Sequence, residues 1–350
     1  MIYSEYNGIR IAAISSAVSQ NVIDFNEIMD DPNEDPKYIK SFIKKTGIVR
    51  KHVASSEQTA SDFSYVSAKL LEEKKRYIPE EIGVLVNVTQ NPDYRTPSTA
   101  SLLHKRLGLN KNCIAFDVNL GCSGFVYGVS IGASLLANSS SKKALIVMGD
   151  TQARGRSSCG ERSSNTRLLF GDASAAVLLE KNPAYTIRSG LMSDGEGYKS
   201  ISSPYGGWRH PEGPELIPGD DIAVFNFTIN EVPELIKDFC AKVGAQTTDY
   251  DSVILHQANM MVMKNVAKRI DVPFEKCPIS IDRYGNTSST SIPLTIVDKY
   301  GSSEEQVCIK LLACGFGIGL SWGVLDFEIN TDDIFSVIET DLTYDDGYKE

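Results

Sequence analysis

Short β-type runs alternate with helical stretches along most of this 350-residue chain, and this alternation constrains the fold more than any other feature. Runs of apolar and β-branched residues predict strands, whereas apolar residues spaced three or four apart predict helices. Their alternation is typical of α/β proteins with layered sheets. Strands are expected at 9–14, 83–88, 113–118, 144–148, 252–255, 306–312 and 319–327, and helices at 60–73, 98–107, 122–136, 221–243 and 259–270.

Each half of the chain contains a short expected strand that ends at a residue able to carry out chemistry. This residue is Cys122 in the first half and His256 in the second. The arrangement suggests two related halves, residues 1–180 and 181–328, although the two sequences show no convincing repeat. The acidic tail at 329–350 is expected to be peripheral.

Charge and composition exclude several classes of protein. The net charge of −10 would repel nucleic acid and anionic membrane surfaces. No apolar run approaches the roughly 20 residues of a membrane helix, and the first 19 residues lack a secretion signal, so a cytoplasmic location is expected. Seven cysteines without C-x-x-C pairs indicate neither a disulfide framework nor a zinc site, and most are expected to be reduced and buried. The Gly-, Pro- and Ser-rich segment 193–220 is expected to be a long surface loop.

The sharpest local signal is the segment from Asp117 to Gly128, which reads Asp-Val-Asn-Leu-Gly-Cys-Ser-Gly-Phe-Val-Tyr-Gly. It predicts a strand, a tight turn and a helix that opens at Cys122. A thiol at a helix N-terminus faces free N–H groups, so we expect a pKa below its usual ~8.5. A buried structural cysteine is the commoner case, but the flanking glycines favour a nucleophile.

The second half offers polar groups that could serve this nucleophile. His256 and Asn259 stand where a β-rich run gives way to a helix. Asn286 lies in a polar turn that could present its amide as a donor, although such a turn is equally a capping loop. The Gly-rich stretch 314–323 could bring backbone N–H groups to a carbonyl oxygen, or simply form a strand bulge. The other three histidines are expected to have ordinary roles.

The order of these segments resembles the ketoacyl synthase III branch of the thiolase superfamily, whose members condense acyl thioesters. The likeness extends to about Phe327. It implies a thiolase-like, five-layered α-β-α-β-α fold. The segments that carry it are Lys45-Thr-Gly47-Ile-x-Arg50, Thr59-Ala-Ser-Asp62, Pro92-Asp-Tyr94, Pro97-Ser98-Thr99, Phe170-Gly171-Asp172-Ala-Ser-Ala175 and the Cys122, His256-Gln-Ala-Asn259 and Gly285-Asn286-Thr segments.

The resemblance implies a role for each matching residue. Cys122 would take an acyl group from acyl-CoA, and a malonyl thioester would enter next. His256 and Asn286 would hydrogen-bond the thioester oxygen as carbon dioxide leaves. The N–H groups of Cys122 and Ile318 would form the oxyanion hole, and Asn259 would support the site. No cofactor or metal is implied, and the pathway implied is fatty acid biosynthesis.

The resemblance also implies substrate and partner contacts. Asn259, Thr96, Phe316 and Lys45 are assigned to the substrate site. The family often has a bulky aromatic where this chain has Thr96, so we expect primers longer or more polar than acetyl. The acyl pocket is completed by a neighbouring copy, which implies a homodimer. Docking of an acyl carrier protein would use Lys264, Lys268 and Arg269.

Departures from the family pattern concern the oxyanion hole, carrier docking and CoA binding, and the substitutions at Met261, Ile318 and Thr96 leave an alternative open. Ile318 replaces a glycine, Met261 replaces a docking arginine, and the tryptophan expected near Ser41 is missing. One alternative is an acyltransferase that passes the acyl group to an amine or hydroxyl without decarboxylation. A non-catalytic partner subunit is disfavoured because Cys122 is intact. A hydroxymethylglutaryl-CoA synthase is disfavoured because residues 88–91 contain no acid.

Overall fold

A nine-stranded mixed sheet forms the centre of the computed structural model, which describes residues 1–32, 34–153, 168–213 and 219–348. The strand order is β5-β4-β6-β7-β10-β9-β8, with β1 beside β7 and β11 beside β1. The strands are β1 (Ile2–Ser19), β4 (Ile82–Val88), β5 (Ile114–Val118), β6 (Lys143–Asp150), β7 (Ala173–Ser193), β8 (Ser252–Leu255), β9 (Cys308–Gly317), β10 (Ser321–Asn330) and β11 (Ile338–Thr340). A separate pair contains β2 (Val22–Asp24) and β3 (Arg50–His52).

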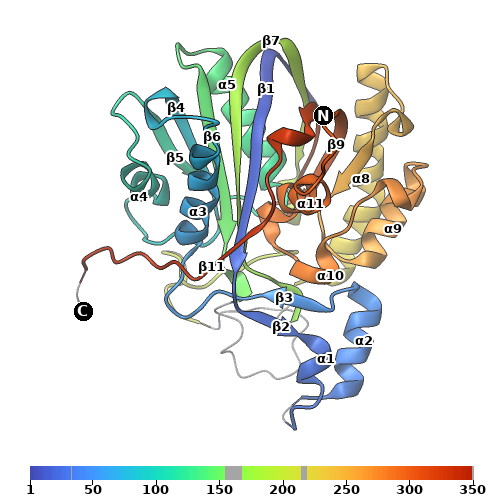
Figure 1. Ribbon diagram of the computed structural model, residues 1–350. Helices are drawn as coiled ribbons and strands as arrows, with labels where there is room; N and C mark the ends of the chain where they lie inside the picture. The colour runs from blue at the N-terminus through green and yellow to red at the C-terminus, as the bar shows by residue number, and fades with distance from the viewer. Residues whose placement is uncertain (33, 154–167, 214–218, 349–350) are drawn as a thin grey trace.

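Strands β1 and β7 are long and serve both ends of the sheet. The first part of β7 pairs with β6 and its last part pairs with β10, while β1 runs antiparallel along nearly its whole length. One end of the sheet is therefore β5-β4-β6 and the other is β8-β9-β10, joined through this shared pair (Figure 1). The boundary expected after residue 180 falls within β7, and the division into related halves stays a prediction.

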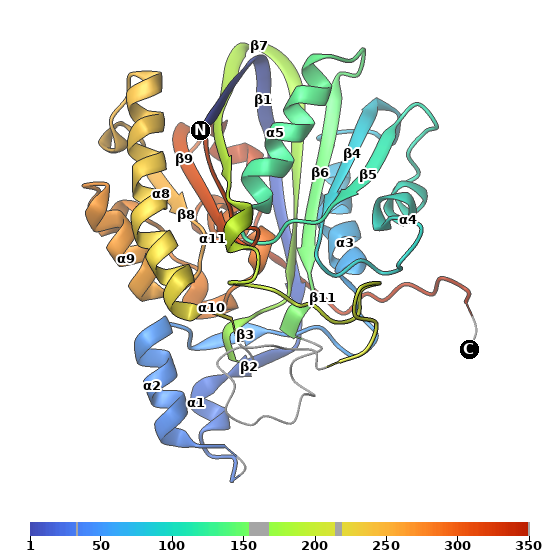
Figure 2. The same cartoon turned by 180° about the vertical axis from the view of Figure 1, so that it is seen from behind.

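Helices occupy three levels around the sheet. Helices α5 (Gly124–Ala137) and α11 (Ser291–Tyr300) both contact β1, β7 and β9, so they lie inside the fold between its two ends. Helices α3 (Ala60–Glu73) and α4 (Thr99–Arg106) cover the outer face of one end, and α8 (Asp221–Val243) and α9 (Met260–Arg269) cover the other (Figure 2). The predicted α/β layering is confirmed.

The inner helices are apolar on most sides, as a central layer requires. Residues of α5 and α11 share one buried cluster with β1, β4, β6, β9 and β10. Glycines allow α5 to approach the sheet closely: an added Cβ at Gly128 would lie 2.9 Å from Val88, and one at Gly132 would lie 2.6 Å from Ile146. The middle of α5 can therefore lie directly on β4 and β6.

Most of the expected elements occur. In the second half of the chain, α8 and β8 have the expected bounds. Strands β9 and β10 begin two residues later than expected and run further. Within 193–220, residues 214–218 lie outside the described part, and the rest contains only a short turn, η2 (Gly195–Gly197). Elements that the sequence did not predict include α1 (Phe25–Ile28), α2 (Pro36–Thr46), α10 (Ile281–Tyr284), β2, β3, β7 and β11.

The C-terminal segment corrects one expectation. β11 pairs in parallel with Ala17–Ser19 of β1, because the end of that strand has free backbone groups to pair with. Asp333 is 3% exposed, and it forms ion pairs with Arg10 at 2.9 Å and Arg76 at 2.8 Å. The prediction that this acidic segment is peripheral is therefore wrong for the residues up to 340, since its buried charge is neutralised by basic partners.

Two further expectations concern membrane helices and the state of the cysteines. None of the helices in the described ranges combines the length and the apolar character that a bilayer crossing needs. Six cysteines of the described part are unpaired; Cys240, Cys277 and Cys314 are buried, whereas Cys308 is exposed. The seventh, Cys159, lies outside the described residues.

Candidate active site

Cys122 lies in the turn that joins β5 to α5. The turn is tight, because the N–H of Gly124 donates to the carbonyl of Gly121 at 2.6 Å. The helix begins at Gly124, with Ser123 as its N-cap, and not at Cys122 as predicted. Cys122 therefore precedes the first helical turn, although its backbone is still fixed by the turn.

Strand β9 packs directly against the cysteine. A Cβ added to Gly317 would lie 2.7 Å from the Cys122 Cβ and 3.2 Å from its Sγ. One added to Gly315 would lie 3.0 Å from the Cys122 carbonyl oxygen. Real Cβ atoms do not approach so closely, so this part of the strand must be free of side chains. The expected approach of the Gly-rich stretch to the reactive residue is thus present in the structure.

His256 follows β8 and is held on three sides. Its backbone N–H donates to the Cys314 carbonyl of β9 at 2.9 Å. Its Nδ1 lies 2.7 Å from the Ser291 hydroxyl at the start of α11. The ring packs edge-on against Phe316, with centroids 5.4 Å apart. The side chain is buried, and this burial lowers the pKa of His256 to about 3, so the imidazole is neutral at physiological pH.

Asn286 is placed by backbone contacts on both sides. Its N–H donates to the Leu169 carbonyl at 2.9 Å, and its carbonyl accepts from the Gly171 N–H at 3.1 Å. Its Oδ1 accepts from the Ser288 N–H at 2.9 Å. Because a backbone N–H must face an oxygen, this bond fixes the orientation of the amide. The Nδ2 group therefore has two N–H donors available for a substrate oxygen.

Shared contacts bring the three predicted residues to one region of the fold. Strand β9 touches Cys122 through Gly317 and His256 through Phe316. On the other side, the Ser288 hydroxyl lies 3.3 Å from a Cβ added to Gly121, next to the cysteine. Ser288 is also the residue whose N–H orients the Asn286 amide. The nucleophile, the imidazole and the amide therefore surround the same segment of β9 and the turn after Asn286.

A buried carboxylate stands behind the nucleophile at the end of β6. Asp150 accepts hydrogen bonds from the Gln90 N–H at 2.7 Å, the Thr89 hydroxyl at 3.2 Å and, more weakly, the Ser289 hydroxyl at 3.5 Å. Burial raises the pKa of Asp150 to about 6. Burial first, and then the charge of Asp150, raise the pKa of Cys122 to about 12.

The predicted lowering of the Cys122 pKa is therefore wrong. A helix dipole contributes about 0.3–1 kcal/mol, which is less than one tenfold change in acidity. Desolvation of a thiolate is the larger effect, and the helix starts two residues too late for Cys122 to sit in its first turn. The Ser288 hydroxyl lowers both pKa values slightly, although its Oγ has no hydrogen bond of ordinary geometry.

Other predicted site residues lie near this region. The Asn259 side chain caps α9 by accepting from the Val262 N–H at 2.8 Å, which fits a supporting role. Phe316 contacts His256, as described above. The Ile318 carbonyl accepts from the Ser321 hydroxyl at 2.6 Å, which in turn lies 2.6 Å from the Ser123 hydroxyl. Ile318 is thus tied to the residue after Cys122.

The predicted basic residues lie on the outer surface of α2 and α9. Lys45 and Lys264 line one cavity of about 300 Å³, together with Lys44, Met260, Met261 and Asn265. Lys268 and Arg269 are exposed on the same helix as Lys264, and Arg269 donates to Asn230 at 3.1 Å. Thr96 lies on a separate loop, where it is exposed. This chain alone does not bring Thr96 to Cys122.

Sequence reasoning missed several residues that position the site. Asp150, Ser288 and Ser291 were not singled out, although the run from Asn286 to Ser291 contains five consecutive hydroxyl residues after the asparagine. All five are buried. Hydroxyls packed so densely before an apolar helix are unusual for a surface turn, and this could have indicated a polar interior.

Comparisons with known proteins find relatives along most of the chain. The family described as 3-oxoacyl-[acyl-carrier-protein (ACP)] synthase III matches residues 116–195, and its C-terminal part matches residues 240–329. The chain is 34% identical over 324 residues to the beta-ketoacyl-[acyl-carrier-protein] synthase III of Xanthomonas campestris pv. campestris, covering 90% of this chain and 96% of that protein. The protein of the same name from Acholeplasma laidlawii is 33% identical with the same coverage.

Solved structures extend the likeness to three dimensions. A 3-oxoacyl-(acyl-carrier protein) synthase from Burkholderia xenovorans superposes with a TM-score of 0.89 at 30% identity, covering 97% of this chain and 99% of that one. The synthase III from Aquifex aeolicus gives a TM-score of 0.75 at 24% identity, over 92% of this chain and all of that one. The second likeness concerns the fold alone.

Proposed function

The chain belongs to the 3-oxoacyl-[acyl-carrier-protein] synthase III family, and we propose that Cys122, His256 and Asn286 form its reaction centre. Members of this family are acyltransferases that join an acyl group to a malonyl unit with loss of carbon dioxide. The observation that carries the residue assignment is the packing of β9. This strand leaves space for the Cys122 thiol at Gly317 and holds the His256 ring with Phe316.

In the first half-reaction, the Cys122 sulfur attacks the carbonyl of an acyl-CoA. The bond from this carbonyl to the CoA sulfur breaks, and the proton of the Cys122 thiol passes to the departing CoA sulfur. The high pKa of Cys122 means that the resting enzyme holds a thiol rather than a thiolate. The product is an acyl-enzyme that carries no extra charge in the buried site.

In the second half-reaction, a malonyl thioester loses carbon dioxide, and its methylene carbon attacks the acyl carbonyl on Cys122. The bond from this carbonyl to the Cys122 sulfur then breaks, and the released thiolate takes up a proton from solvent to return to the thiol. Negative charge develops on the malonyl thioester oxygen. Asn286 offers Nδ2–H donors because its Oδ1 is occupied by Ser288. His256 is neutral, and its Nδ1 lies 2.7 Å from the Ser291 hydroxyl. We assign this hydroxyl as the donor to Nδ1, which places the imidazole proton on Nε2. Two preorganised neutral donors suit an enolate oxygen in a desolvated site.

The oxyanion hole for the acyl carbonyl would use the N–H groups of Cys122 and Ile318. Support comes from the hydroxyl pair of Ser123 and Ser321, which ties the carbonyl of Ile318 to the start of α5. A β-branched residue at this place narrows the backbone angles but keeps the N–H. Acyl-CoA is a substrate in this scheme, and no bound cofactor takes part in it.

The carrier side would be the surface of α2 and α9. With a net charge of −10, the chain needs a local basic patch to attract an acidic carrier protein or the phosphates of CoA. The cavity lined by Lys44, Lys45 and Lys264 offers such a patch, and its two methionines, Met260 and Met261, suit the apolar part of a pantetheine arm. We place the reaction in the cytoplasm.

A homodimer is supported by the free edge of the sheet. β5 is an outer strand, Ile114 is 51% exposed, and the other residues of the strand are half-buried. An exposed edge with unpaired backbone groups is a ready partner for another strand. Pairing of two copies along β5 would place the loop that carries Thr96, which leads into α4 beside this edge, close to the partner chain.

Intact-mass measurement after exposure to a panel of acyl-CoAs tests the proposal. The wild type should gain one acyl group, and Cys122→Ala should gain none. A malonyl thioester labelled at its free carboxyl should then release labelled carbon dioxide. An acyl-enzyme that forms without this release would indicate acyl transfer to another acceptor. Acylation of Cys122→Ala at the wild-type rate would contradict the assignment of the nucleophile.

A further inference from the structure

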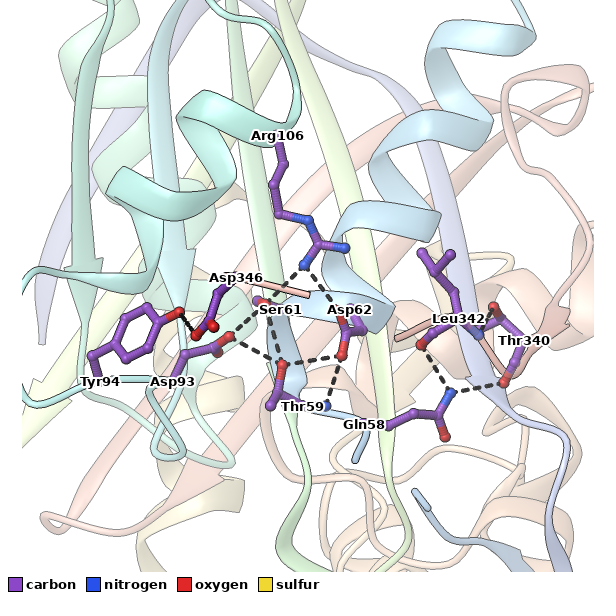
Figure 3. Close-up of polar contacts among 10 residues, drawn as sticks. All are labelled: Gln58, Thr59, Ser61, Asp62, Asp93, Tyr94, Arg106, Thr340, Leu342 and Asp346. Atoms are coloured by element: carbon purple, nitrogen blue, oxygen red, sulfur yellow. Dashed lines mark hydrogen bonds and ion pairs between the residues drawn. The ribbon is translucent and has the colours of Figure 1, made fainter. Parts of the chain in front are cut away.

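A C-terminal strap, defined as residues 338–348, runs from β11 beneath α3 and α4, at the β5-β4-β6 end of the sheet (Figure 1). It lies beyond residue 329, where the family match ends. Its first part is fixed by β11 and by Gln58, whose buried amide donates to the carbonyls of Thr340 at 3.1 Å and Leu342 at 3.2 Å (Figure 3). The strap is therefore a docked part of the fold.

The middle of the strap covers a buried cation. The guanidinium of Arg106 lies between two aromatic rings, 4.6 Å from the centroid of Tyr65 and 4.3 Å from that of Tyr344 in the strap. Its Nη1 forms an ion pair with Asp62 at 2.9 Å, and both side chains are nearly fully buried. A cation stacked on both faces is worth more when it is desolvated, so Tyr344 is held firmly.

The same network reaches the loop that contains Asp93. Arg106 donates to the Ser61 hydroxyl at 3.0 Å, and this hydroxyl donates to Asp93 at 2.6 Å. The Thr59 hydroxyl also donates to Asp93, at 3.0 Å. Figure 3 shows these side chains converging on Asp93 from the start of α3. The loop at residue 93 is thus bonded to the residues that the strap covers.

The end of the strap contacts Tyr94, the next residue of this loop. The Tyr94 hydroxyl donates to Asp346, and the Tyr94 ring packs edge-on against Tyr348, with centroids 5.9 Å apart. On its other side, the loop is held by Arg95, whose guanidinium lies 5.5 Å from the Trp208 centroid. Thr96 follows immediately in the chain.

We propose that the strap sets the primer selectivity of the enzyme, and that Tyr94 is the positioning residue through which it does so. By fixing Tyr94, the strap fixes the path of residues 93–96 and therefore the place of Thr96. This rests on the proposed function, in which Thr96 borders the primer site of a neighbouring copy. The strap holds the loop from outside, so it acts without touching the substrate.

Competition between primers at Cys122 tests the proposal. Equimolar acetyl-CoA and hexanoyl-CoA are mixed with the protein, and the ratio of the two acyl-enzymes is read by intact mass. We compare Tyr94→Phe, Asp346→Asn and a truncation after Leu342, which spares β11 and the contacts of Gln58. Asp341→Asn is the control, because it removes one charge from the exposed part of the strap outside these contacts.

A looser loop should discriminate less between the two primers. The ratio of acetyl-enzyme to hexanoyl-enzyme should therefore move toward one. We expect a change of about threefold for each single variant, since exposed polar pairs contribute little, and about tenfold for the truncation, which also removes the ring that covers Arg106. The control should keep the wild-type ratio. A wild-type ratio in the truncated protein would overturn the proposal.

Hydrogen–deuterium exchange separates this inference from the proposed function. In the truncated protein, amides of residues 91–98 should exchange faster, while those of β11 should keep their protection. Unchanged exchange in that loop would overturn the strap's role as its anchor. If no acyl-CoA labels wild-type Cys122 while the loop still loosens, the proposed function fails and the selectivity assigned to the strap fails with it, whereas the mechanical link between strap and loop stands.

Discussion

The wall of the site that carries Cys122 and the wall that carries His256 and Asn286 are specified by different means. Around Cys122, glycines make room for close packing: Gly317 leaves the space that the thiol occupies, and Gly121 leaves the space that the side chains of Gln90 and Ser288 occupy. Around the donors, hydroxyls and N–H groups of the turn after Asn286 fix each polar atom. The first wall should therefore be sensitive to added volume, and the second to lost hydrogen bonds.

Asn286→Ala should have the largest effect on the rate of condensation. It tests the side of the site that carries the hydrogen-bond donors. Loss of one oxyanion donor typically costs about 10²–10³ in rate, so carbon dioxide release should fall by that factor. Acylation of Cys122 precedes this step and should change by less than about threefold. Separate assays of the two steps measure the difference. Asn138→Ala, at the exposed C-terminal end of α5, is a control, and equal losses in both steps would contradict the assignment.

Gly317→Ala tests the nucleophile wall by adding one methyl group. The new Cβ would lie 2.7 Å from the Cys122 Cβ, so the turn or the strand must move. Displacement of a reacting group by about 1 Å can cost about 100-fold, and acylation should fall by that order. Stopped-flow or quench measurements of acyl-enzyme formation report it. Gly207→Ala meets no atom within 4 Å and should be neutral; near-normal acylation of Gly317→Ala would break the comparison.

Ser291→Ala removes the partner of the His256 Nδ1. Without this hydroxyl the imidazole is free to exchange tautomers, and the Nε2–H donor is populated less. A hydrogen bond of about 1 kcal/mol corresponds to about fivefold in rate, and this loss should appear in condensation only. Ser280→Ala deletes a buried hydroxyl bonded to Thr295 at 2.7 Å and serves as the matched control. Identical effects of both variants would count against an orienting role.

Asp150→Asn should have the smallest effect, and it acts through charge. The carboxylate disfavours a thiolate at Cys122 and so raises its pKa; removing the charge must lower that pKa. The pH profile of Cys122 alkylation by iodoacetamide should therefore shift to lower pH, with about threefold faster labelling at a given pH below the pKa. Asn keeps an acceptor for Gln90 and Thr89. Asp326→Asn, on β10, is the control, and a shift to higher pH would refute the argument.

Much of the fold was predictable because local signals and burial agree. The bounds of α8 were expected from its periodicity, and the structure adds the physical reason: Asp220 caps its start by accepting from the Ala223 N–H, and Gly244 ends it in a left-handed conformation. By contrast, β7 was not predicted, since the Lys-Asn-Pro stretch that ends at Pro183 reads as a turn. The local signal is real, because the Ala184 N–H donates to the Asn182 side chain at 3.1 Å and residues 182–185 have no partner in the register with β1. The stretches on either side pair with β1, so the irregularity lies within one long strand.

The place of the candidate residues was predictable, but their electrostatics were not. Cys122, His256 and Asn286 were singled out from their segments, and the structure places all three around β9 and the turn after Asn286, whereas their roles in the reaction stay a prediction. The Cys122 pKa was predicted in the wrong direction, because it depends on burial and on Asp150, which the fold delivers from another strand. The docking of the strap was missed for a similar reason. Its acidic composition is typical of a solvated tail, and its contact with Arg106 on α4 depends on the fold.

The pair formed by β1 and β7 has a mechanical consequence. Both strands continue from one end of the sheet to the other. Separation of the two ends would therefore break many hydrogen bonds of the antiparallel pair. Such a scaffold has no hinge at its middle. Cys122 is partly exposed in this structure. Any change in access to its thiol is therefore expected in the loops around the site, while the shared pair of strands keeps its geometry.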